Sequence, residues 1–550
     1  MSLAGLMQRQ SLLISDLLAH AATYHGDVEI VSHLHAGEVR RSNWRTVAHR
    51  AAQLAHALPT LGVAEGDRVA TLAWNSDRHL ELYYAVAGTG AVLHTVNPRL
   101  FPEQIAYILG HAADGVVFFD LDFADLLIKM APQLTGVKRF VALCRADQLP
   151  ALDLPHLVSY ESLIEGLPQQ YDWPDLDEGT ASSMCYTSGT TGNPKGVLYS
   201  HRSTVLHSFA LCAADGMALS ARDSVLLAVP MFHVNAWGVP YAAAMCGAKL
   251  VLPGSGLSGE RLYAHMVNEA CTFSLGVPTV WLGFFQYIDQ QGAELDLRAL
   301  RLQRVVVGGS AAPRALIEKF EEKLGVFVIQ SWGMTETSPV STVVSLLPKH
   351  AGQALSDRFA VQSRQGRAIF GVEVAVFGAD GQRLPHDGKS VGEIRVRGPW
   401  VLCAYYGNAP DSALDAQGWF STGDVAYIDP DGFVQITDRS KDVIKSGGEW
   451  ISSIDLENAA VGHPSVREAA VIGVPHSKWQ ERPLLIVVLK PGETLTGPQM
   501  MEFLSDRVVR WWLPDDVVFV DELPHTATGK LLKTRLREQF RDHRLPTDVA

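Results

Sequence analysis

The chain has 550 residues, of which 47% are hydrophobic and 19% are charged, and its formal net charge is −13. A chain of this length is too long for one hydrophobic core, so we expect at least two domains. The acidic balance argues against nucleic acid or an anionic membrane as the main partner, and no window contains the roughly eighteen uninterrupted apolar residues that a membrane span requires.

The N-terminal segment predicts a helix rather than a secretory leader, because Ser15 and Asp16 interrupt the apolar run Leu12–Ile14 at once. Six cysteines are scattered without a C-x-x-C pair, and twenty histidines show no ligand spacing. Free thiols are therefore favoured over a disulfide framework or a zinc site. We expect a cytoplasmic protein.

Strand and helix patterns alternate from Asp67 onward. This order is typical of a parallel α/β unit, in which each helix connects two neighbouring strands. The expected strands and helices are, in chain order, Arg68–Trp74, Leu80–Val86, Ala91–Val96, Pro102–His111 and Gly115–Asp120.

Residues 186–196 form the most informative segment, a run of glycine and hydroxyl residues closed by a lysine. Glycines let backbone N–H groups approach an anion, hydroxyls add donors or a metal contact, and the lysine supplies charge. A strand-like segment follows the lysine, whereas a helix follows it in the ordinary P-loop, and a polar surface loop is the alternative interpretation. The expected polyphosphate site comprises Thr187, Ser188, Gly189, Thr190, Thr191, Gly192 and Lys195.

A second copy of the strand-helix rhythm follows this loop and predicts a second sheet in tandem with the first. A strand-helix-strand crossover comes next, with a helix from Pro313 to Gly325 between strands Arg304–Gly309 and Val326–Gln330. Ligands in such folds bind beyond the carboxyl ends of the strands. That rule predicts one rim of a nucleotide pocket at Gly308, Gly309, Ser310 and Gln330–Glu336.

After Gly366, short strands and tight turns replace the alternation of strands and helices. Residues 366–437 should therefore form a small β-rich subdomain. We expect a large N-terminal domain over 1–438, a hinge over 439–442 and a small α+β domain over 443–550. The last of these has the usual size of a small domain. The predicted fold class is α/β.

Five further motifs follow the phosphate loop. Together with that loop they resemble, in the same order, the motifs of the adenylate-forming enzymes, the superfamily of acyl-CoA synthetases, peptide-synthetase adenylation domains and luciferases. Within it, segments 230–237 and 447–453 look like the medium- and long-chain fatty-acyl-CoA synthetases and the ligase for 3-methylthiopropionate. The five motifs are 331–336 (SWGMTE), 421–424 (STGD), 438–442 (DRSKD), 445–451 (KSGGEWI) and 528–530 (TGK).

The resemblance implies a reaction in which a carboxylate attacks the α-phosphorus of ATP and a thiol then displaces AMP. Such chemistry depends on positioning and electrostatics. Glu336 with the Thr187 hydroxyl would hold Mg²⁺, a cation that prefers oxygen ligands, and Thr335 would donate to the α-phosphate. A solvated loop carboxylate is the alternative for Glu336.

The nucleotide contacts are also implied by the resemblance. Asp424, placed where a strand should end, would accept both ribose hydroxyls, with Arg439 nearby. Trp332 stands where the family usually has tyrosine, so stacking on adenine is kept and a hydroxyl contact is lost. The expected adenine frame is Gly309, Gln330, Ser331 and Trp332.

The small domain carries Lys530, which resembles the adenylation lysine and would enter and later leave the site by domain rotation. Lys441 stands at the position of the family hinge and is also expected to be a nucleotide-binding residue. Trp237 would gate the acyl tunnel, although an ordinary core aromatic is the alternative. The acyl pocket comprises His233, Val234, Trp237, Gly308 and Ser310, and the CoA channel comprises Lys445, Gly447, Gly448 and Trp450.

The expected function is an ATP-dependent acid:CoA ligase that acts on a medium- or long-chain fatty acid, with ATP, CoA and the acid as substrates and Mg²⁺ as cofactor. A ligase for 3-methylthiopropionate or another short acid is the main alternative. A non-catalytic nucleotide-binding protein is the alternative from another class. A homodimer is plausible from the resemblance.

Overall fold

A computed structural model describes residue 3 and residues 5–34, 37–187, 193–439, 442–446, 449–525 and 531–548, with the backbone alone at 449 and 450. The chain divides into two units. The first unit comprises Met1–Ser274, Met334–Pro339 and Ala404–Ala409, and the second unit comprises Leu275–Gly333, Val340–Cys403 and Pro410–Ala550. Within the described part, no helix is both long and apolar enough to cross a membrane.

The first unit contains a seven-stranded sheet in the order β7-β6-β5-β3-β4-β8-β9. All neighbouring strands are parallel except β8 and β9. The expected strand after the phosphate loop is β9. The strands are β3 (Arg68–Leu72), β4 (Val92–Thr95), β5 (Val116–Phe119), β6 (Arg139–Ala142), β7 (Leu157–Ser159), β8 (Ala181–Tyr186) and β9 (Gly196–Ser200).

A second sheet in this unit places β10 between β11 and β12, and β1 between β11 and β2. β1 runs parallel to β11 and antiparallel to β2, so the chain's first two strands belong to the later sheet. The strands are β1 (Glu29–His33), β2 (Val39–Asn43), β10 (Ser224–Leu226), β11 (Lys249–Leu252) and β12 (Phe273–Gly276).

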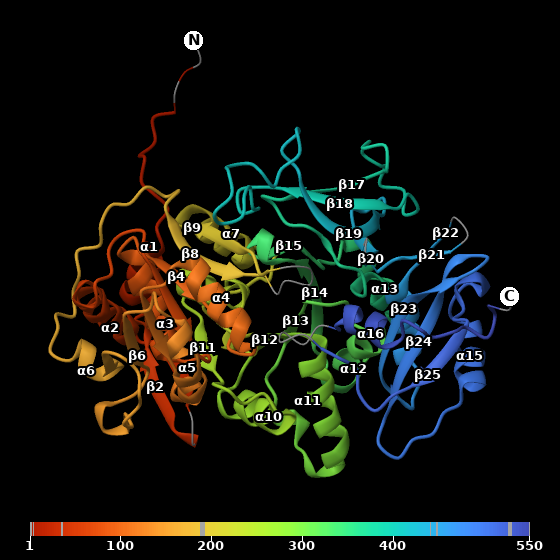
Figure 1. Ribbon diagram of the computed structural model, residues 1–550, viewed down its shortest axis with the longest axis horizontal. Helices are drawn as coiled ribbons and strands as arrows, with labels where there is room; N and C mark the ends of the chain where they lie inside the picture. Colours follow the sequence, from red (N-terminus) through yellow and green to blue (C-terminus); the bar gives the residue numbers. More distant parts are fainter. Residues whose placement is uncertain are drawn as a thin grey trace. The chain divides into compact units, whose positions relative to one another are not determined.

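Helices cover the seven-stranded sheet, with α4 and α5 packed on one face through Ile105, Leu109, Leu127 and Met130 (Figure 1). α3 is buried at every residue. The helices of the first unit are α1 (Ile14–Tyr24), α2 (Trp44–Ala57), α3 (Asp77–Gly88), α4 (Pro102–Ala112), α5 (Ala124–Met130), α6 (Tyr160–Ile164), α7 (His201–Cys212), α8 (Val234–Trp237), α9 (Val239–Cys246) and α10 (Gly259–Asn268).

The second unit begins with the expected crossover, in which β13 and β14 are parallel and α12 lies between them in sequence. α12 ends at Gly325, whose φ of 65° is the left-handed conformation that glycine adopts at no steric cost. The elements are α11 (Pro278–Gln291), β13 (Arg304–Val307), α12 (Arg314–Leu324), β14 (Phe327–Gly333), β15 (Val340–Val343), α13 (Leu355–Gln362) and β16 (Arg367–Ala368).

An antiparallel sheet in the order β17-β18-β19-β20 follows and confirms the expected β-rich segment. One detail differs from expectation. Asp424 lies inside β19 rather than at a strand end, next to a register shift in the pairing with β20. The strands are β17 (Glu373–Phe377), β18 (Gly392–Arg397), β19 (Phe420–Ile428) and β20 (Val434–Arg439).

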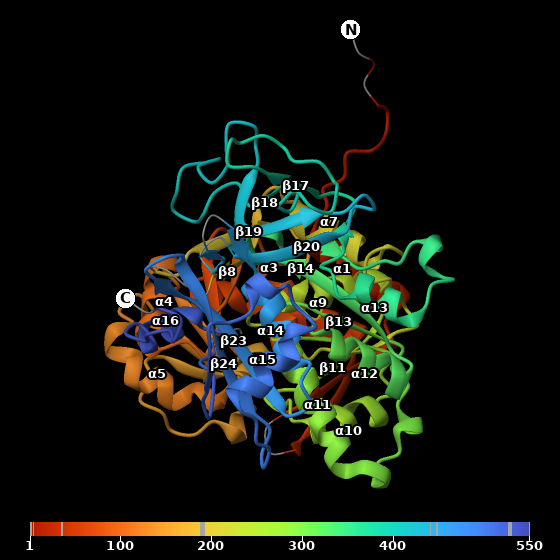
Figure 2. The same ribbon diagram turned by 90° about the vertical axis from the view of Figure 1, so that its right-hand side faces the viewer.

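The C-terminal segment has one sheet with helices on both faces (Figure 2). Alternate residues of β23 and β24 pack on α14 and α15, and the intervening ones pack on Leu536 of α16. The elements are β21 (Ile444–Ser446), β22 (Glu449–Ile451), α14 (Ser453–Val461), β23 (Val466–His476), β24 (Gln480–Leu489), α15 (Gly497–Ser505), β25 (Asp516–Phe519) and α16 (Lys533–Gln539). The expected α/β class is confirmed.

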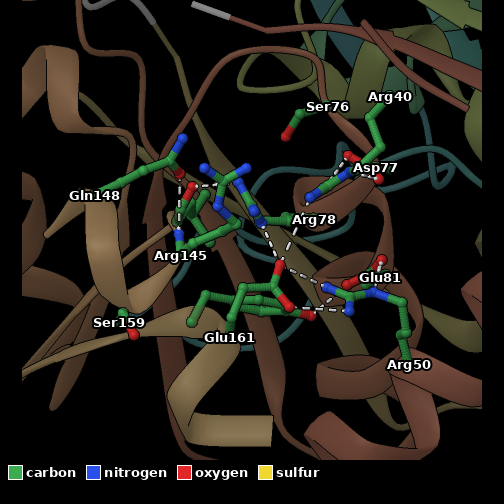
Figure 3. A network of polar contacts seen from close by, with 12 residues as sticks. Arg40, Arg50, Ser76, Asp77, Arg78, Glu81, Arg145, Gln148, Ser159 and Glu161 are labelled. Carbon is green, nitrogen blue, oxygen red and sulfur yellow. Dashed lines mark hydrogen bonds and ion pairs between the residues drawn. The ribbon is translucent and has the colours of Figure 1, made fainter. Parts of the chain in front are cut away.

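Glu161 of α6 accepts from guanidinium groups on three other elements of the first unit (Figure 3). Arg50 donates to it from both terminal nitrogens at 3.0 Å, Arg78 Nε donates at 2.8 Å, and Arg40 Nη1 lies 3.5 Å away. These residues line a polar groove of about 1060 Å³. Burial opposes ionisation of Glu161, but the hydrogen bonds and charges of Arg50 and Arg78 outweigh it, and the net effect is a lowered pKa.

We expect Glu161→Gln to lower the free energy of unfolding by about 2 kcal/mol, because three partly buried arginines lose their shared carboxylate. The loss should fall short of that for a fully buried pair, since 26% of the Glu161 side chain is exposed. The folded-state pKa lies below the ordinary 4.5, so the contribution is complete above that pH and disappears as the pH falls through the folded-state pKa. Denaturant unfolding of wild type and variant should therefore converge in acid.

Glu165→Gln is the matched control, because Glu165 is an exposed residue just after the same helix. An equal loss of stability in both variants, or a difference that persists unchanged as the pH is lowered into strong acid, would contradict the role given to Glu161.

Candidate functional site

The ends of the phosphate loop lie on β8 and β9. Thr187 N donates to Lys195 O at 2.9 Å, and Lys195 N donates to the Thr187 hydroxyl at 3.3 Å, so the loop closes on itself at its base. The predicted contacts Ser188, Gly189, Thr190, Thr191 and Gly192 lie outside the described residues.

Tyr405 lies between Glu336 and Lys195, the lysine that closes the phosphate loop. Tyr405 donates to Glu336 Oε1 at 2.8 Å, and Lys195 Nζ lies 4.7 Å from the centroid of the Tyr405 ring. Burial and the charge of Glu336 raise the pKa of Tyr405, which keeps its hydroxyl proton available as a donor. Both Glu336 and Tyr405 belong to short segments that return to the first unit. The sequence did not predict Tyr405 as a site residue, because no local pattern marks a segment that returns from far along the chain.

Thr335, the other catalytic candidate here, is buried in a short turn, and its carbonyl accepts from Tyr199 of β9 at 2.8 Å. This bond ties the Thr335–Glu336 turn to the strand that leaves the phosphate loop. Three predicted residues, Thr335, Glu336 and Lys195, therefore share one neighbourhood. Among the described residues, no group of three or more His, Cys, Asp or Glu side chains is placed to hold a metal.

A separate cluster in the second unit joins three predicted nucleotide contacts. Trp332 Nε1 donates to Asp424 Oδ2 at 2.9 Å, and Arg439 Nε lies 3.2 Å from the other oxygen. Asp424 and Arg439 face each other across β19 and β20. Asp424 is buried whereas about half of Arg439 is exposed. The tryptophan therefore keeps a polar contact through its indole N–H, although the sequence suggested only the loss of a hydroxyl.

The glycine rim lies where parallel-sheet geometry predicts it. Gly308, Gly309 and Ser310 directly follow β13, and Gly309 has a φ of 80°. Gln330 lies inside β14 and is fully buried, and its amide nitrogen and oxygen have no hydrogen-bond partner among the described residues. Ser331 uses its hydroxyl to donate to Thr342 O at 3.1 Å, so its side chain supports the strand pairing.

The acyl-pocket candidates occupy an unusual turn. Val234 and Trp237, with the two residues between them, all have positive φ values, from 45° to 58°. Left-handed conformations cost L-residues roughly 1–2 kcal/mol each and persist only where surrounding contacts impose them. Trp237 is 8% exposed, which fits either a gate or core packing. His233 immediately precedes this turn.

The remaining predicted residues belong to the C-terminal segment. Lys441, Gly447, Gly448 and Lys530 lie outside the described residues, as does the side chain of Trp450. Lys445 N donates to Glu481 at 3.0 Å.

The helix that follows the 526–530 segment is anchored by two ion pairs, neither of which the sequence suggested. Lys533 pairs with Glu457 at 2.7 Å, and Arg537 pairs with Asp442 at 2.6 Å. The second pair joins α16 to the residue just beyond the predicted hinge position Lys441.

A cation missed by the sequence reasoning lies beyond the carboxyl end of β4. The Arg99 guanidinium lies 5.5 Å from the ring centroids of both Trp74 and Phe232. No ion pair joins it to a carboxylate within the described part of the chain, and burial lowers its pKa. An arginine that rests on two aromatic rings, with no ion pair to a carboxylate among the described residues, is suited to bind an anion.

Comparison with known proteins places these features in context. A model of the AMP-binding enzymes matches residues 17–406, and a model of their C-terminal domain matches residues 455–530. A 3-methylmercaptopropionyl-CoA ligase from Ruegeria lacuscaerulensis is 51% identical over 98% of this chain and 99% of its own length. A medium-chain-fatty-acid–CoA ligase from Ectopseudomonas oleovorans is 50% identical over 98% of both chains.

Among solved structures, the anthranilate CoA ligase AuaEII in complex with anthranoyl-AMP superposes with a TM-score of 0.85. It covers 97% of this chain and 98% of its own at 23% identity, so the similarity concerns the fold alone.

We expect Trp332→Phe to raise the dissociation constant for ATP about five- to tenfold, because Asp424 loses a hydrogen bond worth about 1 kcal/mol and is less firmly oriented toward a ribose. The control is Trp400→Phe, which removes a buried indole N–H bond to Val340 O in the same unit. Fluorescence or calorimetric titration with ATP measures the effect. Equal affinities of the two variants would contradict the assignment.

Proposed function

This chain belongs to the AMP-binding enzymes, the adenylate-forming superfamily, and from that membership we propose that it is an AMP-forming acid:CoA ligase. It would activate a carboxylic acid with ATP and transfer the acyl group to CoA, releasing pyrophosphate and AMP. The observation that carries the proposal is the grouping of Lys195, Tyr405 and Glu336 at the base of the phosphate loop.

In the first half-reaction, the carboxylate of the acid attacks the α-phosphorus and pyrophosphate leaves. Lys195 and the loop from Thr187 bind the β- and γ-phosphates, and Thr335 donates to the α-phosphate. Glu336 and Thr187 offer oxygen donors of the kind that Mg²⁺ prefers. When bound there, Mg²⁺ neutralises phosphate charge. Tyr405 holds the Glu336 carboxylate in one orientation through its hydrogen bond.

The nucleotide would lie between the glycine rim and the tryptophan cluster. Asp424 accepts the ribose hydroxyls, Arg439 contacts the ribose or phosphate, and Trp332 supplies a stacking face while its N–H orients Asp424. Gly308, Gly309 and Ser310 leave room for adenine and the acyl group. Arg99 is suited to bind a phosphate of CoA, because its charge lacks an acidic partner among the described residues.

We place a domain boundary at 439–442, between an N-terminal domain 1–438 and a mobile domain 443–550. Lys441 is the hinge, and Lys530 enters the site for adenylation and leaves it for thioester formation. The Lys445–Trp450 stretch then lines the CoA channel, where Gly447 and Gly448 let the thiol arm pass close to the backbone.

The substrate is proposed to be a medium- or long-chain fatty acid, with 3-methylthiopropionate as the main alternative. The two relatives differ by a single percentage point in identity, so overall similarity does not separate these acids. We propose that the enzyme works in the cytoplasm, and that a homodimer is its assembly. A non-catalytic nucleotide-binding protein is the remaining alternative from another class.

AMP formation with ATP and CoA should be measured with linear acids from three to eighteen carbons and with 3-methylthiopropionate. A ligase gives CoA-dependent AMP and acid-dependent pyrophosphate. The absence of both with every acid would favour the non-catalytic alternative, and the acid with the highest kcat/KM identifies the substrate class.

We expect Glu336→Ala to lower acid-dependent pyrophosphate release about 10²-fold or more, because a charge-stabilising contact is removed. Tyr405→Phe should cost less, about tenfold, because the carboxylate remains and only its orienting bond is lost. Glu322→Ala, on the exposed side of α12, serves as the control. Wild-type release by Glu336→Ala at ordinary Mg²⁺ would refute its assignment.

Lys530 and Gly448 should separate the two half-reactions. Lys530→Ala is expected to abolish acyl-AMP formation yet keep most of the rate when synthetic acyl-AMP and CoA are supplied, since the second step has no triphosphate charge to offset. Gly448→Leu, which crowds the thiol channel, should do the reverse. Equal losses in both half-reactions for Lys530→Ala would be incompatible with domain rotation.

A further inference from the structure

Asn75 makes three side-chain hydrogen bonds to a single loop. The loop comprises residues 227–231, follows β10 and leads directly to His233. Asn75 Nδ2 donates to Leu227 O at 2.7 Å and to Val229 O at 2.8 Å, and its Oδ1 accepts from Met231 N at 2.7 Å. Asn75 is 4% exposed. Both amide N–H groups and the amide oxygen are thus used by the same five-residue loop.

The backbone of Asn75 is also held in place. The residue follows β3, and its backbone carbonyl accepts from Gly254 N at 3.2 Å. Tyr83 of α3 supports the same loop by donating to Met231 O. The carboxyl ends of β3 and β10, which belong to different sheets of the first unit, are therefore joined through one amide group.

An amide is required at this position because the loop presents two carbonyl oxygens and one N–H. Aspartate has the same shape but offers only acceptors, so its carboxylate would face two carbonyls without a donor. Serine is too short to reach all three groups. Leaving a buried backbone group without a partner costs about 1–3 kcal/mol.

The far end of the same segment is held in a similar way. Asn235, inside the left-handed turn, donates from Nδ2 to Ser183 Oγ at 2.8 Å and accepts from Cys185 Sγ at 3.4 Å. Ser183 and Cys185 lie on β8, next to the phosphate loop. His233 and Val234, which lie between the 227–231 loop and Asn235, are thus held from both sides, which explains how a strained turn persists.

We propose that Asn75 is a positioning residue that sets which acids the enzyme accepts, by fixing the 227–231 loop and with it His233 and Trp237. The inference rests on the proposed function. Small displacements of groups that orient a substrate cost large factors in rate. Release of the loop should therefore alter acid selection while ATP binding, which uses other elements, is retained.

The test compares Asn75→Asp and Asn75→Ser with wild type across the same series of acids. We expect kcat/KM for the preferred acid to fall about tenfold or more, as the loss of buried hydrogen bonds predicts. The profile over chain length should broaden, and the KM for ATP should change less than twofold. Activity of Asn75→Asp should partly recover at lower pH, because a protonated carboxyl group donates to one of the two carbonyls. Asn75→Ser supplies the answer where the aspartate variant is not recovered folded.

Thr71→Val is the matched control. It removes a buried hydrogen bond of 3.0 Å between Thr71 Oγ1 and His79 Nε2, which joins the same β3 and α3 and does not itself involve residues 227–231. We expect a similar fall in melting temperature and an unchanged acid profile. A wild-type profile in both Asn75 variants, or an equal profile change in Thr71→Val, would overturn the proposal. Failure of the proposed function is distinguishable, since wild type would then form no AMP with any acid.

Discussion

The first unit depends on the pairing of the charged side chains that α3 buries. A helix buried at every residue leaves its charged side chains little access to water, so each of them needs a partner within the protein. The partners come from β2, α2, β3 and α6, which fixes these elements against the helix. The ion pairs are Asp77–Arg40, Arg78–Glu161 and Glu81–Arg50, with Tyr160 also donating to Glu81. Burial lowers the pKa of His79 to about 4, and its ring shares a hydrogen bond with Thr71.

This buried helix also fixes the position of the candidate site. Asn75 immediately precedes α3, and Tyr83 and Tyr84 extend from it to Met231 O and Pro240 O. The segment that carries His233 and Trp237 is therefore held by α3, the same helix that the network of charged residues surrounds. The turn that carries Glu336 is held independently, through Tyr199 and Tyr405. The proposed acid pocket and the proposed phosphate site are therefore supported by different sets of contacts.

Local patterns predicted most of the α/β elements, because strand and helix periods are properties of short segments. They did not predict that β1 and β2 join the later sheet, since pairing across such separations leaves no local signal. Asp424 was expected at a strand end because of the Thr422-Gly423 turn signal, yet cross-strand pairing with Arg439 continues through it. Long-range pairing decided both cases.

The candidate site shows the same division. The motifs and their family resemblance predicted Lys195, Glu336, Trp332 and Asp424 as site residues. The structure joins Lys195 to Glu336 through Tyr405, and Trp332 directly to Asp424. Tyr405, Arg99 and Asn75 belong to no motif that reveals their contacts. Their importance arises from what lies opposite them, such as two aromatic rings or three backbone groups, and that information exists only in the folded chain.

The discontinuity of the first unit has a consequence for biosynthesis. Its phosphate-loop lysine is made early, whereas Glu336 and Tyr405 reside in segments 334–339 and 404–409 that return to it much later. On the ribosome, this unit cannot acquire its complete set of contacts until residue 409 has emerged, by which time part of the second unit has been synthesised. A nascent chain therefore passes through a stage in which the strands of both sheets of the first unit have been synthesised and the proposed triphosphate site is still incomplete.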